Sequence, residues 1–203
     1  MEKVLVILPV YNESECLDKI FDSVLEFCQK NHCYRFLFVN DGSTDNTQQI
    51  LERKIVDAKN INISVVSYSS NRGKGYAIKK GVEYGQEDYI CFLDGDLAYS
   101  LVHLEILVAH LNFFDIVIGC RNLIPPSLKQ VKLTRLVAGK AFNIISRKVL
   151  SLNFSDMQAG IKGFRKEVAQ DLFSQQSLRG FGFDVELIVR IVLSKWVKYP
   201  RTA

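Results

Sequence analysis

Short apolar runs alternate with segments of helical periodicity through the first half of the chain. The apolar runs are rich in valine, isoleucine and phenylalanine, which favour strands, and turn residues bound them. In the segments between them, apolar side chains recur every three or four positions, as on one face of a helix. The predicted strands span residues 3–10, 35–40, 62–68, 89–94 and 115–119. The predicted helices span residues 14–30, about 47–59, 75–85 and 100–111, with Ser14 as the expected N-cap of the first.

Strands that alternate with amphipathic helices predict an α/β fold built from βαβ units. The apolar runs are nearly continuous, which indicates a mostly parallel, Rossmann-like sheet covered by helices on both faces. In such sheets ligands bind beyond the carboxyl ends of the strands. The polar residues that follow the predicted strands are Tyr11, Asn12, Glu13, Asp41, Gly42, Ser43, Asn71, Arg72, Gly73, Lys74, Asp94, Gly95, Asp96 and Arg121. We therefore expect a site where these residues gather, at one edge of the sheet.

The composition is that of an ordinary globular domain. The chain has 203 residues, 48% of them hydrophobic and 24% charged, which is enough for one continuous core. We expect no secretory leader, and no apolar run reaches the roughly 20 residues of a membrane span. The five cysteines are scattered without C-x-x-C spacing, which indicates reduced thiols in a cytosolic protein.

The net charge of +4 conceals an asymmetry between the two halves of the chain. Residues 1–100 carry 11 basic and 15 acidic side chains, whereas residues 101–203 carry 15 basic and 7 acidic ones. No acidic residue lies between Asp115 and Asp156, a stretch that contains several lysines and arginines. Such a segment indicates an anionic partner, namely a phosphate, a nucleic acid or a membrane surface, unless it is simply a solvated face.

Two carboxylates, Asp94 and Asp96, flank Gly95 directly after the apolar run "YICFL". Two acids at a strand end can bind one hard cation, and oxygen ligands suit Mg²⁺ or Mn²⁺, which keep waters and bridge to substrate phosphates. The glycine lets the backbone turn closely around the ion. The alternative is that Asp96 caps the next helix and Asp94 is a turn residue. The pair alone does not decide between these interpretations.

Asp41 and the segment "NRGKG" stand at two further strand ends. Asp41 can accept a hydrogen bond from a base or a ribose, although "DGSTD" is also good turn chemistry. The segment "NRGKG" brings cations and glycines to its loop, but the chain has no G-x-x-x-x-G-K-[ST] pattern. It also has no G-x-G-x-x-G pattern after the first strand. The sequence therefore disfavours a P-loop nucleoside triphosphatase and a dinucleotide oxidoreductase.

Four motifs in a fixed order carry a family resemblance: "PVYNE" (9–13), "VNDGSTDNT" (39–47), "NRGKGYA" (71–77) and "LDGDL" (93–97). Together they resemble the signatures of family 2 inverting glycosyltransferases with a GT-A fold. Two later segments, "DMQAGIKGFRKEVA" (156–169) and "GFGFDVELI" (180–188), are similar to the polyprenyl-phosphate branch, especially dolichyl-phosphate glucosyltransferases. The resemblance implies one GT-A domain over residues 1–203. Its nucleotide-sugar half would span about 1–120 and its acceptor half about 121–203.

The resemblance implies a donor site in the first half of the chain. Asp94 and Asp96 would hold Mg²⁺ or Mn²⁺ on the diphosphate of a nucleotide sugar, where the cation stabilises the charge of the leaving group. The donor nucleotide would contact Pro9, Tyr11, Glu13, Asp41, Lys74 and Gly95. Ala98 stands where mannosyl-transferring relatives usually carry glutamine, which favours glucose from UDP-glucose over mannose from GDP-mannose.

The resemblance also implies an acceptor site in the basic second half. A polyprenyl phosphate brings its own anionic nucleophile, so the enzyme needs cations that bind the phosphate. The candidate phosphate-binding residues are Arg121, Arg135, Lys162 and Arg165. Asp156 is the first candidate for a catalytic residue that orients or activates the acceptor, and Asp184 is the second. Asp184 can equally cap the helix that is predicted at residues 184–193.

The expected partners are a nucleotide-sugar donor, a polyprenyl phosphate acceptor, and either a membrane surface or a membrane partner protein. Residues 129–151 can form a helix that lies on the membrane, which predicts a peripheral location at its cytoplasmic face. Three other functions remain open: transfer to a hydroxyl acceptor, which needs a general base, nucleotidyl transfer to a sugar phosphate, and nucleic-acid binding. We expect no nucleic acid partner, because the aromatic residues are not interleaved with the cations as a stacking platform requires.

Overall fold

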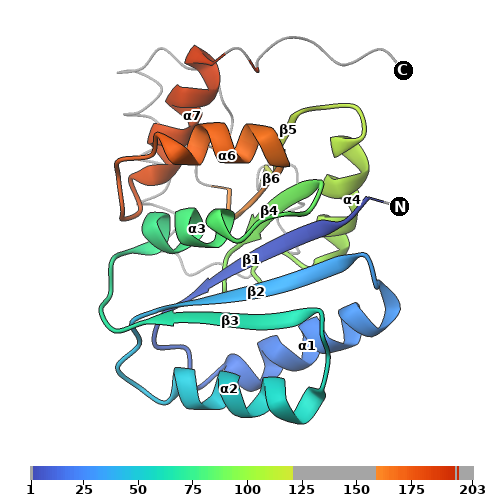
Figure 1. Cartoon of the computed structure of the whole chain (residues 1–203), viewed down its shortest axis with the longest axis vertical. Coiled ribbons are helices and arrows are strands. Elements are labelled where there is room, and N and C mark those ends of the chain that lie inside the picture. Colours follow the sequence, from blue (N-terminus) through green and yellow to red (C-terminus); the bar gives the residue numbers. More distant parts are fainter. Residues whose placement is uncertain (1, 121–158, 195, 197–203) are drawn as a thin grey trace.

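The computed structural model describes residues 2–120, 159–194 and 196 (Figure 1). Its six-stranded sheet consists of β1 (Val4–Val10), β2 (Tyr34–Asp41), β3 (Ile63–Tyr68), β4 (Tyr89–Leu93), β5 (Ile116–Ile118) and β6 (Ile161–Arg165). The helices are α1 (Leu17–Lys30), α2 (Thr47–Ala58), α3 (Lys74–Glu83), α4 (Leu101–Leu111), α6 (Lys166–Ser174) and α7 (Phe183–Leu193). The five strands and four helices predicted for the first 120 residues are all present, with small differences at their ends.

The sheet is mixed but mostly parallel, with the strand order β3-β2-β1-β4-β6-β5. β1 pairs in parallel with both β2 and β4, and β2 pairs in parallel with β3. β6 is antiparallel to both of its neighbours, β4 and β5. The predicted α/β, Rossmann-like fold is confirmed, and β6 is an addition that separates the fifth predicted strand from β4.

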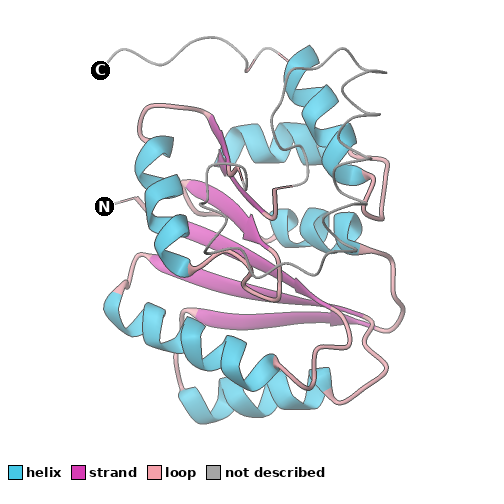
Figure 2. Ribbon diagram, turned by 180° about the vertical axis from the view of Figure 1, so that it is seen from behind, coloured by secondary structure: helices cyan, strands magenta, loops and turns pink. Residues whose placement is uncertain are grey.

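Helices cover both faces of the sheet, and each covered face has its own apolar layer (Figures 1 and 2). Alternate residues of β1 point into the two layers, since Val6 and Leu8 belong to one and Leu5 and Ile7 to the other. The first layer includes buried residues of α1, α2 and α4, and the second includes those of α3, α6 and α7. This burial on both sides explains why the parallel strands show continuous apolar runs.

The prediction that Ser14 caps the first helix was wrong. α1 begins at Leu17, its N-cap position is Cys16, and no side chain forms a cap hydrogen bond there. Instead, the backbone N–H of Ser14 donates to Asp45 Oδ2 at 3.2 Å. Residues 11–16 therefore form a loop that contacts the loop after β2, an interaction between distant segments that outweighs the local capping preference.

Candidate active site

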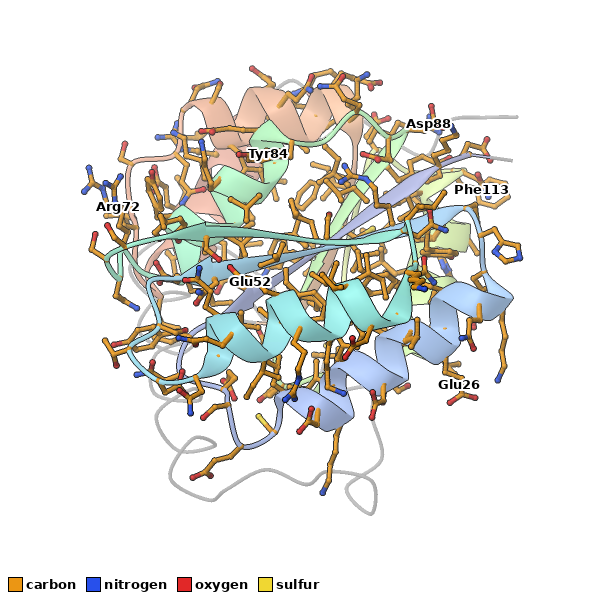
Figure 3. The ribbon with its side chains drawn as sticks, turned by 60° about the horizontal axis from the view of Figure 1, so that its bottom comes forward. Glu26, Glu52, Arg72, Tyr84, Asp88 and Phe113 are labelled. Carbon is orange, nitrogen blue, oxygen red and sulfur yellow. The ribbon has the colours of Figure 1, made fainter. Side chains whose placement is uncertain are left out.

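The carboxyl ends of β1, β2, β3 and β4 lie at one edge of the sheet, and the four motif loops follow them. Arg72, in the loop after β3, marks this edge in Figure 3. Asp88 and Phe113, which lie just before β4 and β5, are at the opposite side of the same view. The structure thus brings the loops of all four motifs to one edge, as the rule for parallel sheets predicts.

The first two motif loops hold each other through side chain to backbone hydrogen bonds. Asn12, which has a φ of 54°, receives a hydrogen bond on its side-chain oxygen from the N–H of Thr44 at 2.8 Å. The carboxylate of Asp45 accepts the N–H groups of Ser14 and Thr47. Burial raises the pKa of the Asp45 carboxyl, but these hydrogen bonds outweigh it and lower the pKa to about 2. The "DGSTDNT" motif is therefore the anchor of the "PVYNE" loop.

The nucleotide residues expected from the "PVYNE" motif lie in different environments. Pro9 is part of β1, and the Tyr11 side chain is 43% exposed at the end of that strand. The Glu13 carboxylate accepts the thiol of Cys16 at 2.8 Å. Burial and this carboxylate together raise the pKa of the Cys16 thiol to about 11, so Cys16 is the donor of that bond. Tyr11 is thus the aromatic residue of this motif that exposes a ring to a ligand.

Asp41, which the sequence predicts to contact the nucleoside, is 3% exposed and is engaged by the chain itself. Its carboxylate accepts the hydroxyl of Tyr68 at 2.7 Å and the backbone N–H groups of Arg72 and Gly73 at 2.7 and 2.9 Å. Gly73 has a φ of 94°, a conformation that favours glycine. Asp41 therefore fixes the turn that leads into α3 and to Lys74, and its contact with a nucleoside stays a prediction.

Gly95 is required by a close approach between two strand ends. A Cβ on this residue would lie 2.3 Å from the carbonyl oxygen of Pro9, which is far inside van der Waals contact. The two aspartates on either side of Gly95 are consequently held next to the end of β1. The expectation that this glycine permits a tight backbone turn at the carboxylate pair is in line with that geometry.

Asp94 is paired with a cation from the neighbouring motif. Lys74, the first residue of α3, places its Nζ 2.5 Å from Asp94 Oδ1. Asp96 is exposed, and its carboxylate accepts the N–H of Ala98 at 3.1 Å, while the helix that follows begins only at Leu101. The N-cap position of that helix is Ser100, so the alternative in which Asp96 caps it was wrong. The Lys74 ammonium therefore joins the third motif to the fourth.

These residues fit a divalent cation of the Mg²⁺ or Mn²⁺ type. Asp94 and Asp96 offer carboxylate oxygens at one strand end, and Lys74 shows that Asp94 already holds a positive charge there. Within residues 2–120, 159–194 and 196, no group of three or more His, Cys, Asp and Glu residues could form a metal site. Mg²⁺ at phosphate sites usually binds one or two carboxylates together with waters and substrate phosphates, and this pair offers two such carboxylates.

Asp184 is neither an exposed catalytic acid nor a helix cap. The residue is 3% exposed and lies in the first turn of α7, where the N-cap position is Gly182 and no side chain forms a cap bond. Its Oδ1 lies 2.5 Å from the Nζ of Lys162, whose side chain is 0% exposed. Lys162 also donates to the carbonyl of Ala159 at 2.8 Å and lies over the ring of Phe92. The predictions of Asp184 as a cap and of Lys162 as an accessible phosphate ligand were wrong, because the two side chains satisfy each other inside the protein.

Arg165, a further predicted phosphate ligand, lies at the wrong end of β6. It pairs with Tyr89, the first residue of β4, whereas Ile161 pairs with Leu93 next to the carboxylates. Four residues of a strand separate the two positions by roughly 13 Å. Arg165 donates to the carbonyl of Leu111 and forms an ion pair with Asp115 at 3.4 Å. The antiparallel direction of β6 therefore removes Arg165 from the site. Arg121, Arg135 and Asp156, like the 129–151 segment, lie outside the described residues.

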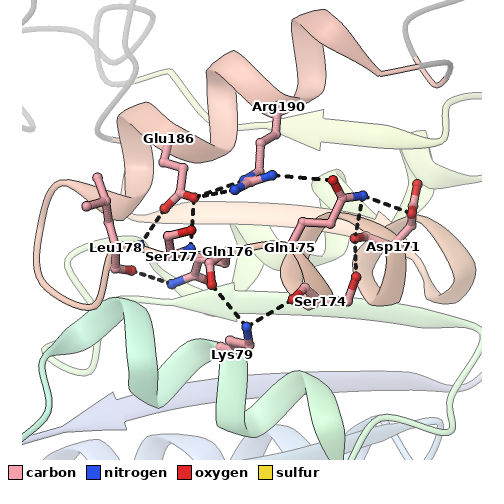
Figure 4. Close-up of polar contacts among 9 residues, drawn as sticks. All are labelled: Lys79, Asp171, Ser174, Gln175, Gln176, Ser177, Leu178, Glu186 and Arg190. Carbon is pink, nitrogen blue, oxygen red and sulfur yellow. Dashed lines mark hydrogen bonds and ion pairs between the residues drawn. The ribbon is translucent and has the colours of Figure 1, made fainter.

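The loop between α6 and α7, residues 175–182, packs against α3, a contact that was not predicted from the sequence. The polar contacts that hold it, drawn in Figure 4, involve Lys79, Asp171, Ser174, Gln175, Gln176, Ser177, Leu178, Glu186 and Arg190. Glu186 accepts the N–H groups of Ser177 and Leu178 at 2.8 and 2.7 Å, and Lys79 donates to the carbonyl of Gln176 at 3.0 Å. The carbonyl of Arg179 accepts the N–H of Tyr76 at 3.0 Å. Glu186 is an acidic residue in the first turn of α7, a position from which a carboxylate can accept backbone N–H groups, and this was the feature of the sequence that could have indicated the contact.

Comparison with known proteins agrees with the fold. The model of the family described as Glycosyl transferase family 2 matches residues 5–173, so this chain belongs to that family. Its fold is the GT-A fold. The crystal structure of Mycobacterium tuberculosis glucosyl-3-phosphoglycerate synthase with uridine diphosphate superimposes with a TM-score of 0.66 at 21% identity, covering 94% of this chain and 65% of the other. The same enzyme has also been crystallised with Mn²⁺, UDP and glucosyl-3-phosphoglycerate, at a TM-score of 0.64 and 19% identity, with the same coverage.

Several curated relatives act on polyprenyl phosphates by name. The dolichyl-phosphate beta-glucosyltransferases of Dictyostelium discoideum and Homo sapiens are 26% and 27% identical, over 90% and 96% of this chain. The polyprenol monophosphomannose synthase of Mycolicibacterium smegmatis is 28% identical over 94% of this chain and 72% of its own length. The chain spans 60% and 64% of the length of the two glucosyltransferases. In the part of the chain that the structure describes, no helix is long and apolar enough to cross a membrane.

Proposed function

We propose that this chain transfers a hexose, with inversion, from a nucleoside diphosphate sugar to a polyprenyl phosphate, and that the donor is UDP-glucose. The observation that carries the proposal is the carboxylate pair Asp94 and Asp96 at the carboxyl edge of the sheet, with the Lys74 ammonium on Asp94. Carboxylates that bind a divalent cation, next to a lysine, are the chemistry that a diphosphate leaving group requires. Similarity to dolichyl-phosphate beta-glucosyltransferases supports the choice of sugar and acceptor.

The donor would lie across the loops at the carboxyl edge. Asp94 and Asp96 would hold Mg²⁺ or Mn²⁺, which when bound neutralises the charge that develops on the departing diphosphate. Tyr11 is exposed beside this edge and offers a ring on which a base can stack, and the loop that Asp41 fixes presents Lys74 to the phosphates. Pro9, Glu13 and Gly95 would then shape the backbone around the nucleotide rather than bind it by charge.

The acceptor would need no strong base, because a phosphate monoester is already an anionic nucleophile. The burial of Asp184 agrees with this, since its side chain is only 4% exposed and is paired with Lys162 inside the protein. Arg121 and Arg135 are proposed to contact the acceptor phosphate, and Asp156 is proposed to orient the acceptor. The acceptor half would lie against the cytoplasmic face of a membrane or a membrane partner protein. Mannose from GDP-mannose is the second candidate donor, because one relative is a polyprenol monophosphomannose synthase.

The proposal is tested by measuring thermal stability with UDP, UDP-glucose, GDP or GDP-mannose, each with and without Mn²⁺. We expect UDP species to raise the melting temperature only when Mn²⁺ is present, and Asp96→Ala to abolish the increase. Asp57→Ala is the matched control, because Asp57 is an exposed acid of α2. Equal stabilisation by GDP would favour mannose, and no stabilisation by any nucleotide would contradict the donor site.

The acceptor is tested separately by transfer of labelled glucose from UDP-glucose. We expect label to move into the organic phase when a polyprenyl phosphate is supplied, and not when the free polyprenol is supplied. Transfer to the free polyprenol but not to the polyprenyl phosphate would show that the acceptor is a hydroxyl. That result would contradict the phosphate acceptor and leave the proposed donor site unaffected.

A further inference from the structure

The contact between Lys74 and Asp94 is held from both sides by the fold. The backbone before Lys74 is fixed, because the N–H of Gly73 donates to the buried Asp41 carboxylate. The Lys74 ammonium lies 5.7 Å from the ring centroid of Phe183, which belongs to the second apolar layer. The side chain of Lys74 is only 16% exposed, compared with 34% for Asp94. The ammonium is thus a built-in part of the site rather than a mobile surface charge.

The Asp94 carboxylate has little room to turn away from this lysine. The backbone N–H of Asp94 donates to the carbonyl of Gly160 at 2.8 Å, and a Cβ on Gly160 would lie 2.0 Å from Asp94 Oδ2 and 2.5 Å from the Asp94 carboxyl carbon. One oxygen therefore rests on the Gly160 backbone while the other, Oδ1, contacts Lys74. A cation that binds Asp94 has to share the carboxylate with the Lys74 ammonium or displace it.

The Lys74 ammonium lies within ion-pair distance of the site's carboxylate, with its Nζ 2.5 Å from Asp94 Oδ1. Asp184 has its own cation in Lys162, which leaves the Lys74 charge directed mainly to Asp94. A divalent ion and an ammonium on the same carboxylate repel each other strongly at partly buried positions.

We propose that Lys74 is a counter-ion that keeps divalent cations off Asp94 until a nucleoside diphosphate arrives. The inference rests on the proposed function, since it concerns the cation of the same donor site. The diphosphate brings negative charge for both the metal ion and the ammonium, so Lys74 exchanges the Asp94 carboxylate for a phosphate oxygen. The metal and the donor then bind together, and the empty site does not collect metal ions.

The test measures Mn²⁺ binding to the full chain by the EPR signal of free Mn²⁺, with and without UDP. Without nucleotide, we expect Lys74→Met to bind Mn²⁺ about tenfold more tightly than the unmodified chain, because the competing charge is gone. With saturating UDP, Lys74→Met should bind Mn²⁺ no more tightly than the unmodified chain, or less tightly, because the diphosphate of UDP has lost the Lys74 ammonium as a partner. Lys80→Met is the matched control. Lys80 lies on the same helix and pairs with Glu83, so the variant loses a lysine but should bind Mn²⁺ as the unmodified chain does. Lys74→Gln serves as a second variant, and circular dichroism verifies the folding of both.

The outcomes separate this inference from the proposed function. If the unmodified chain binds Mn²⁺ only with UDP, and both Lys74 variants bind it without UDP, the counter-ion role is supported. If the unmodified chain binds Mn²⁺ with UDP but neither folded Lys74 variant binds Mn²⁺ alone any better, the counter-ion role is refuted and the donor site stands. If no Mn²⁺ binds even with UDP, the donor site is refuted, and the counter-ion role with it.

Discussion

Replacement of Lys162 by methionine should strongly destabilise the protein. The side chains of Lys162 and Asp184 are 0% and 4% exposed and lie 2.5 Å apart at the charged atoms. Methionine has nearly the length of the lysine stem, so the main loss is the charge and its hydrogen bonds to Asp184 and to the carbonyl of Ala159. The remaining carboxylate would be buried without its partner, which typically costs about 3–5 kcal/mol in the free energy of unfolding.

Thermal unfolding followed by circular dichroism measures this loss. For a chain of this size, each 1 kcal/mol corresponds to about 2–4 °C, so the melting temperature should fall by roughly 6–20 °C. The double variant Lys162→Met/Asp184→Val should recover most of the difference, because replacing both members of a buried pair by apolar residues is often neutral. Lys30→Met is the control, since Lys30 and Glu26 form an exposed pair and its loss should leave the melting temperature unchanged.

Two results would refute this reasoning. A decrease of less than about 2 °C in Lys162→Met would mean that the Asp184 carboxylate finds another partner or reaches water. A double variant as unstable as the single one would mean that Lys162 acts through packing against Phe92 rather than through its charge.

Three further predictions test the site and its surroundings. Gly95→Ala should lower the melting temperature and abolish the stabilisation by Mn²⁺ and UDP, because its Cβ would collide with the Pro9 carbonyl at 2.3 Å; a normal UDP response would contradict this. The pKa of Asp45 is lowered to about 2 from 3.8, so its stabilising effect is complete above about pH 4 and is lost as the pH falls towards about pH 2. Asp45→Asn should flatten that part of a plot of melting temperature against pH, and an unchanged plot would show that other carboxyls cause the acid transition. Arg165→Met should lower the melting temperature yet leave UDP binding with Mn²⁺ intact, because Arg165 lies at the far edge of the sheet. Loss of UDP binding in this variant would show that Arg165 contributes to the site.

The sequence by itself determined the strands and helices of the first half and the edge at which the site lies. Parallel strands that are buried on both faces have nearly continuous apolar runs, and these are visible without a structure. The order of the strands did not need to be known either, since every parallel strand delivers its polar motif to the same edge. Asp94, Asp96 and Lys74 could be grouped for that reason alone.

Only the tertiary structure decided which charges belong to the site. "GIKGFR" contains cations and glycines and gives no clear strand pattern, so neither β6 nor its antiparallel direction could be predicted. That direction sends Arg165 to the far edge and buries Lys162 beside Asp184, a residue 22 positions further along the chain. Sequence patterns report local periodicity, whereas a charge becomes a ligand, a counter-ion or a core residue through its distance from groups that lie far away in the chain.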